Sequence, residues 1–462
     1  MPRHTHFIGI GGIGMSALAE LLLAHGEQVS GCDRTPSHIT ERLRSLGATV
    51  HLGHDPSHLQ GVHRVVFTDA IHADNPELFA AQAQGLEVLR RSQLLGAMMA
   101  QVCGVAVTGT HGKTTVTAMI ALILMAAGRD PSVLVGGEMP ELGGNFRAGA
   151  GPLLVAEACE AYGSFLELRP RCAVITNMEA EHLDFYRDLA DIAHTFMQFV
   201  RRLPADGLLV TCADRPELAP IAAAGPARRS TYGLTETADY RAHDLREGDP
   251  TRFAVTGPAG LLGEVSLPAP GQHMVVNATG ALALCLELGV DFAVAARALA
   301  GFHGVGRRFQ VLGEVDGITV MDDYAHHPTE IRATLAAARA RCRGRLTVVF
   351  QPHLYSRTQQ FMADFARAFA DADRLLLVDI YPAREDPLPG VSSEALARAV
   401  RQASPGKEVA WVGPKEAAGP RLVSMLAPGD WAVTMGAGDV DTVGRAVLAA
   451  LRARAPAPEG RS

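Results

Sequence analysis

The sequence predicts an α/β protein of three domains, each built on a sheet of mainly parallel strands. The length of 462 residues suits about three domains of roughly 150 residues each. Short apolar runs of strand type alternate with helical patterns, and two such runs end in glycine-rich loops. We place the domains at residues 1–99, 100–311 and 312–462. The first and third should be Rossmann-like and the central one of the P-loop type.

Composition narrows the classes of partner. Hydrophobic residues make up 48% of the chain, and its net charge is −7, which gives no sign of a nucleic-acid or membrane partner. The longest apolar stretch, Ala118–Ala127, is about half a membrane span. Seven scattered cysteines without a Cys-x-x-Cys pair predict reduced thiols. Met1 leads at once into a glycine loop, so we expect no signal peptide and a cytoplasmic protein.

The first segment carries a dinucleotide-binding pattern. A strand at Phe7–Ile10 overlaps the glycine loop Gly9–Gly14, and a helix over Met15–His25 follows. The next strand, Gln28–Cys32, ends at Asp33, which has the position of a ribose-binding acid. A glycine turn at a helix N-terminus accepts any pyrophosphate, so NAD and a UDP-sugar are both admissible. Taken alone, the pattern favours NAD.

The second segment opens with a phosphate-loop pattern. The run Val105–Val107 predicts a strand, and Thr108–Thr115 reads Thr-Gly-Thr-His-Gly-Lys-Thr-Thr. This is a shortened variant of the standard loop, and an incidental glycine turn is the alternative. Lys113 is the only lysine before Lys407, although lysine and arginine together number 42. A lysine kept in so arginine-rich a chain indicates that a compact ammonium is needed at a phosphate, with a threonine hydroxyl for Mg²⁺.

Two glutamates follow the predicted strand Leu153–Ala156. Glu157 and Glu160 are suitable Mg²⁺ ligands because this ion takes hard oxygens, usually one or two carboxylates plus phosphates. Without the phosphate loop, two solvated loop acids would be the better interpretation.

A histidine among acids follows the predicted strand Ala173–Thr176, in the segment 177–184. His182 could be a metal ligand, a phosphate contact or a solvated loop residue, and taken alone the segment favours the last. Zinc is disfavoured because no second histidine or cysteine pair has the required spacing.

The third segment alternates strands and helices again. Its polar motifs follow apolar runs, which places them at the open edge of a parallel sheet. Arg357 could bind a carboxylate through two parallel hydrogen bonds. The tail Ala453–Ser462 lacks a core pattern and is predicted to be disordered. The predicted strands are Leu346–Phe350, Leu375–Val378 and Ala432–Thr434, and the motifs are 322–328, 351–353 and 436–439.

Together these motifs resemble the Mur ligase family, and within it most closely the branch that adds L-alanine. The resembling segments span nearly the whole chain: Gly9–Ser16, Thr108–Thr115, Asn177–Asp184, Asp322–Pro328, Phe350–His353 and Met435–Asp439. The resemblance implies that ATP activates the carboxylate of UDP-N-acetylmuramate as an acyl phosphate. L-alanine then attacks it, in the synthesis of a peptidoglycan precursor.

The resemblance also implies site residues. The first domain would hold UDP-N-acetylmuramate rather than NAD, through Gly11, Gly12, Gly14, Ser16, Asp33 and Thr68. ATP would contact Gly109, Thr110, His111, Gly112, Lys113, Thr114, Thr115, Asn277, Arg308 and Asp323. Mg²⁺ would be held by Thr114, Glu160 and His182. His326 and Arg357 would orient L-alanine, so the catalytic set is Lys113, His182, His326 and Arg357.

The sequence departs from the family pattern in three segments, with the departures at Asp69, Cys159, Ala161 and Leu354 among them. Several sister ligases use a carbamylated lysine near the metal. With no lysine between Lys113 and Lys407 that device is impossible, which agrees with the L-alanine-adding branch.

Three rival functions remain open on the sequence. A sister ligase could join a recycled peptide to the same sugar nucleotide. A NAD-dependent oxidoreductase could use the first domain, but would leave the phosphate loop unexplained. A nucleotide-dependent binding module without turnover is the third. We expect a monomer or weak dimer.

Overall fold

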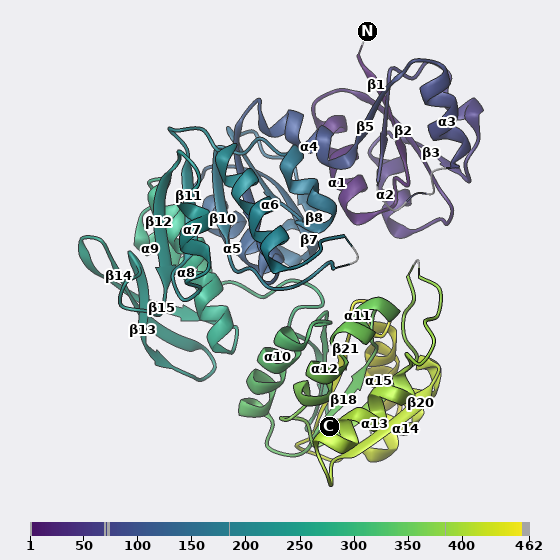
Figure 1. The fold of residues 1–462 in the computed structure, drawn as a ribbon, viewed down its shortest axis with the longest axis vertical. Helices are drawn as coiled ribbons and strands as arrows, with labels where there is room; N and C mark the ends of the chain where they lie inside the picture. The colour runs from purple at the N-terminus through teal and green to yellow at the C-terminus, as the bar shows by residue number, and fades with distance from the viewer. Residues whose placement is uncertain (1, 69–70, 72–73, 184, 384, 455–462) are drawn as a thin grey trace, which may run out of the picture. The chain divides into compact units, whose positions relative to one another are not determined.

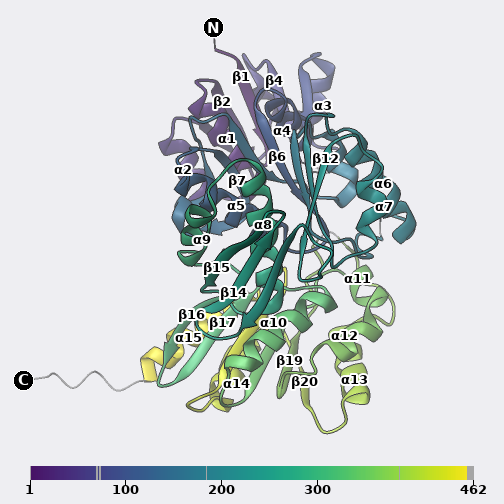
Figure 2. The same cartoon turned by 90° about the vertical axis from the view of Figure 1, so that its left-hand side faces the viewer.

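The protein has three α/β parts, which confirms the predicted fold class. The structure, a computed structural model, describes residues 2–68, 71, 74–183, 185–383 and 385–454, and these form sheets of five, ten and six strands. In Figures 1 and 2 the purple-to-blue, teal and green-to-yellow segments correspond to the three sheets in chain order.

The first sheet is wholly parallel, in the order β3-β2-β1-β4-β5. The strand order reverses between β1 and β4, and ligands bind at such a switch point in open α/β sheets. The loop after β1 is the glycine turn. Strands are β1 (His4–Ile8), β2 (Gln28–Asp33), β3 (Thr49–Leu52), β4 (Arg64–Phe67) and β5 (Glu87–Arg90); helices are α1 (Ile13–Ala24), α2 (His38–Ser45), η1 (Pro56–Leu59), α3 (Pro76–Ala83) and α4 (Arg91–Met99).

The second sheet has a parallel centre, where β10, β6 and β9 are neighbours. Their carboxyl ends therefore meet at one edge. Its strands are β6 (Cys103–Thr108), β7 (Ser132–Met139), β8 (Gly144–Arg147), β9 (Leu153–Glu157), β10 (Cys172–Ile175), β11 (Leu208–Cys212), β12 (Arg228–Gly233), β13 (Tyr240–Arg246), β14 (Thr251–Gly257) and β15 (Gly260–Leu267). Its helices are α5 (Lys113–Ala126), η2 (Pro140–Leu142), η3 (Ala161–Glu167), α6 (Leu189–Arg201), α7 (Leu218–Ala222), α8 (Gln272–Glu287) and α9 (Phe292–Ala300).

The third sheet has the order β16-β17-β21-β18-β19-β20, and only the β16–β17 pair is antiparallel among its pairings. Its strands are β16 (Gln310–Val315), β17 (Ile318–Asp323), β18 (Leu346–Phe350), β19 (Arg374–Val378), β20 (Glu408–Gly413) and β21 (Trp431–Met435). Its helices are α10 (Pro328–Arg341), α11 (Tyr355–Gln360), α12 (Met362–Ala368), α13 (Ser393–Ala403), η4 (Lys415–Ala417), α14 (Ala418–Met425) and α15 (Asp441–Arg454). One core joins the sheet to α10, α12 and α13, and another joins it to α14 and α15.

The strands predicted from apolar runs are all present, with ends that differ by a few residues. The antiparallel strands at the sheet edges were not predicted, because strands such as β14 alternate buried and more exposed residues and do not form the continuous apolar runs on which the prediction relied. Helix α15 continues to Arg454, so the first two residues of the tail predicted to be disordered are helical. The remainder, 455–462, lies outside the described residues.

The chain divides into two compact units, and we describe each by itself. The first comprises 1–246, 252–268 and 275–303, and the second comprises 247–251, 269–274 and 304–462. Within the described ranges, the structure has no helix with the length and apolar character needed to cross a membrane.

Candidate active site

The glycine turn of the first domain is fixed to the end of β2. The backbone N–H groups of Gly9 and Ile10 donate to the carbonyl oxygen of Cys32 at 2.9 and 3.0 Å. The N–H of Gly11 donates to Asp33 Oδ2 at 2.9 Å. A Cβ built on Gly11 would lie 2.8 Å from that oxygen, so the close approach requires glycine. Asp33 thus shapes the turn, besides its predicted contact with the ribose.

The other residues predicted for the sugar nucleotide lie around this turn. Thr68 is close to Gly9, since a Cβ there would be 3.8 Å from Thr68 Cγ2. A Cβ on Gly14 would lie 3.2 Å from Arg91. Ser16 is buried in α1, and its hydroxyl donates to Ile13 O at 3.0 Å. Asp69, one of the departures from the family pattern, lies outside the described residues.

The phosphate loop of the central domain joins β6 to α5. Gly109 and Gly112 have φ of +132° and +81°, backbone conformations that glycine adopts without strain. Gly112 caps α5, whose first residue is Lys113. The loop therefore directs a helix N-terminus toward the strand edge, where backbone N–H groups and the helix dipole favour an anion.

The segment after β10 holds this loop in place. Asn177 and His111 exchange two hydrogen bonds, from His111 N to Asn177 Oδ1 at 2.9 Å and from Asn177 Nδ2 to His111 O at 3.0 Å. Thr176 Oγ1 donates to the same carbonyl at 2.6 Å. The sequence reasoning named this segment for His182 and missed its role as an anchor. A side-chain amide directly after a strand beside a phosphate loop is the signal that could have shown it.

Lys113 forms a buried ion pair with Glu160. Its Nζ lies 2.9 Å from Glu160 Oε2 and donates to the carbonyl oxygens of Gly109 and Thr110 at 2.5 and 3.0 Å. The Glu160 side chain is only 3% exposed. Burial opposes ionisation of Glu160, but Lys113 and His182 outweigh it and hold the pKa of this carboxyl below its usual value.

The predicted metal ligands lie at the adjoining strand ends. His182 Nε2 is 3.6 Å from Glu160 Oε1, and His182 has the unusual φ of +56°. On the other side, Thr114 Oγ1 donates to Glu157 Oε2 at 3.1 Å. The result is a set of hard oxygens and one imidazole beside the phosphate loop, a donor set that suits Mg²⁺ together with phosphate oxygens.

Helix α8 brings Asn277 to the same loop. A Cβ built on Gly112 would lie 2.7 Å from Asn277 Oδ1. Thr110 and Thr115 are buried in and next to the loop. Of the residues predicted for ATP, those from Gly109 to Thr115 and Asn277 are therefore assembled within the first unit.

In the second unit, Asp323 ties two segments together at the end of β17. Its two carboxylate oxygens accept from the N–H groups of Phe309 and Ala325, both at 2.7 Å. Arg308 lies over the Tyr324 ring, 4.9 Å from its centroid. In this arrangement Asp323 acts on the backbone, and its role at an ATP ribose remains a prediction.

A cluster at the ends of β17 and β18 contains the residues predicted for L-alanine. His326 Nδ1 donates to Tyr324 O at 3.0 Å, and the rings of His326 and His353 are 6.2 Å apart. Arg357 Nη1 donates to His353 Nδ1 at 2.9 Å. A guanidinium only donates hydrogen bonds, so His353 Nδ1 is the acceptor in this contact. Sequence reasoning quoted His353 in a motif but gave it no role.

We expect Asp323 to make the third domain pH-sensitive. Burial raises the pKa of this carboxyl from 3.8 to about 6, with Arg308 and the backbone donors opposing. The folded state therefore takes up a proton that the unfolded chain releases. This contribution to stability is greatest below pH 4 and is lost as the pH rises through 6, by about 3 kcal/mol.

Tryptophan fluorescence can measure this effect, because both tryptophans, Trp411 and Trp431, lie in the third domain. Urea unfolding at pH 4.5 and 7 should show a smaller pH effect in Asp323→Asn than in the native protein. The control Asp371→Asn removes an exposed carboxylate of the same domain and should retain the native difference. Equal pH effects in all three proteins would contradict the assignment.

Three α/β domains, with a lysine-bearing phosphate loop at the strand ends of the central one, define a three-domain nucleotide-binding protein. Three family models match most of the chain: "Mur ligase family, catalytic domain" over 4–102, "Mur ligase middle domain" over 107–285 and "Mur ligase, glutamate ligase domain" over 307–438. The chain belongs to the Mur ligase family, as its motifs predicted.

Eight relatives that are 44–48% identical and match nearly end to end share one name. The UDP-N-acetylmuramate–L-alanine ligase of Geobacter sp. (strain M21) is 47% identical over 453 residues, covering 98% of each chain. That of Renibacterium salmoninarum is 48% identical, covering 97% of this chain and 96% of its own. The UDP-N-acetylmuramate–alanine ligase crystal structure from Thermotoga maritima superposes with a TM-score of 0.81 at 30% identity, covering 97% and 99%. A murein peptide ligase from Psychrobacter arcticus gives 0.73 at 26% identity, covering 97% and 98%.

Proposed function

We propose that this protein is the ATP-dependent ligase that joins L-alanine to the carboxylate of UDP-N-acetylmuramate, an early step of peptidoglycan synthesis. The observation that carries the proposal is the assembly of Lys113 and His182 on the buried carboxylate of Glu160 beside the phosphate loop. Relatives named UDP-N-acetylmuramate–L-alanine ligase are 47–48% identical over nearly the whole chain, which supports the choice of substrates. It also favours a UDP-sugar over NAD in the first domain.

The reaction begins with phosphoryl transfer. A carboxylate oxygen of the sugar nucleotide attacks the γ-phosphorus of ATP, the bond to the bridging oxygen breaks, and ADP leaves. Catalysis of this step is mostly positioning and charge neutralisation. Lys113, already aimed across its own loop, supplies the fixed positive charge, and Asn277 and Arg308 would contact the nucleotide and its phosphates.

The Lys113–Glu160 pair suggests how the site is kept charged before ATP binds. A buried carboxylate and ammonium satisfy one another, which avoids leaving either charge unpaired in a low dielectric. Thr114, Glu160 and His182 would hold Mg²⁺, which neutralises phosphate charge when bound. Lys113 would then act on the phosphates instead of on Glu160.

Amide formation is the second step, and residues of the third domain would bind its amine substrate. The amine nitrogen of L-alanine attacks the acyl phosphate carbon, a tetrahedral intermediate forms, and phosphate leaves as the nitrogen loses a proton. Arg357 would bind the L-alanine carboxylate, and His326 would orient the amine. We further propose domain limits at 99/100 and 311/312, a cytoplasmic location, and a monomer or weak dimer.

The decisive assay is phosphate release from ATP and Mg²⁺ with UDP-N-acetylmuramate, adding one amine at a time. We expect release only with the sugar nucleotide and L-alanine together, and weaker or no release with glycine or L-serine. Turnover only with the recycled tripeptide would instead assign the chain to the peptide-adding sister ligases, whose fold it shares. Oxidation of NADH without ligation would instead support the alternative function, a NAD-dependent oxidoreductase.

A further inference from the structure

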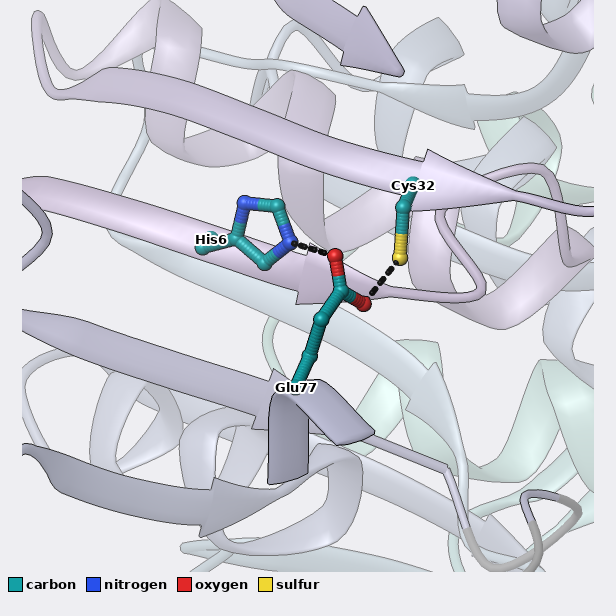
Figure 3. Close-up of side chains that lie close together, drawn as sticks. All are labelled: His6, Cys32 and Glu77. Atoms are coloured by element: carbon teal, nitrogen blue, oxygen red, sulfur yellow. Dashed lines mark hydrogen bonds and ion pairs between the residues drawn. The ribbon is translucent and has the colours of Figure 1, made fainter. Parts of the chain in front are cut away.

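A cluster of metal-binding side chains lies in the first domain, away from the residues assigned to ATP. His6 on β1, Cys32 on β2 and Glu77 on α3 converge with donor atoms within 4.8 Å of one another, and all three are fully buried. Figure 3 shows the Glu77 carboxylate between the His6 imidazole and the Cys32 thiol. The three come from separate elements, which the fold brings to the α3-covered side of the sheet.

Two further histidines approach the same carboxylate. His54 Nδ1 is 3.1 Å from both Cys32 Sγ and Glu77 Oε2. His58 Nδ1 is 2.6 Å from Glu77 Oε1. The thiol itself donates to Glu77 Oε2 at 2.7 Å. Two further imidazoles thus contact the carboxylate of the three-residue cluster, and that of His54 also contacts the thiol.

His6 provides an independent indication of a ligand. Its Nδ1 contacts Ser30 Oγ at 2.9 Å, which fixes the ring. Its Nε2 points at Glu77 Oε1 from 3.6 Å, beyond hydrogen-bond distance, and makes no hydrogen bond although it is buried. A buried polar atom without a hydrogen bond costs free energy unless something binds it. An imidazole oriented through Nδ1 with Nε2 aimed at an acid and a thiol is the usual presentation of a metal ligand.

We propose that this cluster is a binding site for a zinc-type divalent cation, held by His6 Nε2, Cys32 Sγ, the Glu77 carboxylate and His54 Nδ1. One nitrogen–sulfur–oxygen set of four donors suits tetrahedral Zn²⁺. At Zn–N and Zn–S lengths of about 2.0 and 2.3 Å, tetrahedral donors lie roughly 3.3–3.7 Å apart. The contacts that Glu77 makes with Cys32, His54 and His6, at 2.7, 3.1 and 3.6 Å, are within about 1 Å of these lengths, and the thiol proton leaves on binding.

The charges also balance. Burial and Glu77 raise the pKa of the Cys32 thiol strongly, so without a metal it stays protonated and serves as a donor to Glu77. Burial works against the Glu77 carboxylate, but the nearby His6 imidazole and the hydrogen bonds from Cys32 and His58 lower its pKa to about 2. A thiolate and a carboxylate then neutralise a 2+ ion, while His58 is left to orient Glu77.

The site lies directly behind the glycine turn. The carbonyl of Cys32 accepts from Gly9 and Ile10, and the next residue, Asp33, accepts from Gly11. A metal on the Cys32 sulfur would fix the end of β2, to which the glycine turn is hydrogen-bonded. This consequence rests on the proposed function: loss of the metal should weaken binding of UDP-N-acetylmuramate, with little effect on ATP.

Metal binding can be tested without the ligase reaction. The full-length protein, stripped with a chelator, is reloaded with Zn²⁺ alone, desalted, and its zinc content measured. We expect one strongly held ion per chain, and an affinity at least about tenfold lower in Cys32→Ser and in Glu77→Gln. Cys285→Ser, which alters another fully buried thiol, should bind as the native protein does.

Cobalt absorption locates the ion. Co²⁺ bound to a thiolate gives a ligand-to-metal band that Cys32→Ser should lose and Cys159→Ser, beside the phosphate-loop acids, should keep. Loss of the band in Cys159→Ser alone would move the ion to that loop and overturn the proposal. So would native protein that retains no more zinc than Cys32→Ser. The zinc content of the native protein is the main measurement, so the proposal can be contradicted even if a variant fails to fold.

Discussion

Lys113→Ala should reduce phosphate release at least about 1000-fold, which corresponds to about 4 kcal/mol of transition-state stabilisation. The substitution removes the ammonium that pairs with Glu160; among the described residues, the only other side chain within ion-pair distance of this carboxylate is the imidazole of His182. The variant would lack the fixed ammonium at the phosphate loop, so only Mg²⁺ and Arg308 would remain to neutralise the transferring phosphoryl group. Single-turnover ADP formation with saturating substrates measures this step apart from product release.

Lys407→Ala is a matched control for that change. Lys407 is also partly buried and also donates to backbone carbonyls, those of Phe369 and Ala370 at 2.7 and 3.0 Å. It lies in the third domain away from the motifs, so its loss should leave turnover near the native value. Near-normal ligation by Lys113→Ala would contradict the phosphate-site assignment.

A loss of fold must be separated from a loss of chemistry in this test. Removing Lys113 leaves Glu160 buried and without its main partner, which destabilises the central domain. UDP-N-acetylmuramate binding to the first domain should survive in a folded variant. Lys113→Arg keeps the charge but replaces a compact ammonium with a planar fork, so we expect it to restore stability better than activity.

Local motifs predicted much of the central site. The strand, the glycine turn and the lysine bias are properties of one short segment, so Lys113 could be identified before the fold was known. The acid after β9 and the histidine after β10 gained meaning only when parallel pairing put those strand ends on either side of β6. Sequence spacing carries no information about which strands are neighbours.

The residues that sequence reasoning missed act across long separations. Asn177 holds a loop 66 positions away. The cluster of His6, Cys32 and Glu77 draws on three elements, with no ligand spacing of the kind that short metal motifs have. The histidine–arginine pair of His353 and Arg357 is local, yet its geometry depends on the turn at Leu354, whose φ of +69° is rare for leucine.

Arg357→Ala should raise the apparent KM for L-alanine by roughly 10- to 100-fold, the range expected for a charge-assisted contact to a carboxylate. The KM for ATP should change little. Arg357 is almost fully buried and its Nη1 is directed by His353, so the guanidinium is oriented before the substrate arrives. Steady-state kinetics with each substrate varied in turn provide the two constants.

Two further variants decide whether the effect is specific. Arg357→Lys keeps the charge but cannot bind a carboxylate through two parallel hydrogen bonds, so its KM for L-alanine should remain high. Arg339→Ala is the control, because Arg339 belongs to the same domain and pairs with Asp373 at 2.7 Å. It should leave both constants unchanged. A rise confined to ATP in Arg357→Ala would refute the amino-acid role, since a group that binds the amine substrate changes its affinity first.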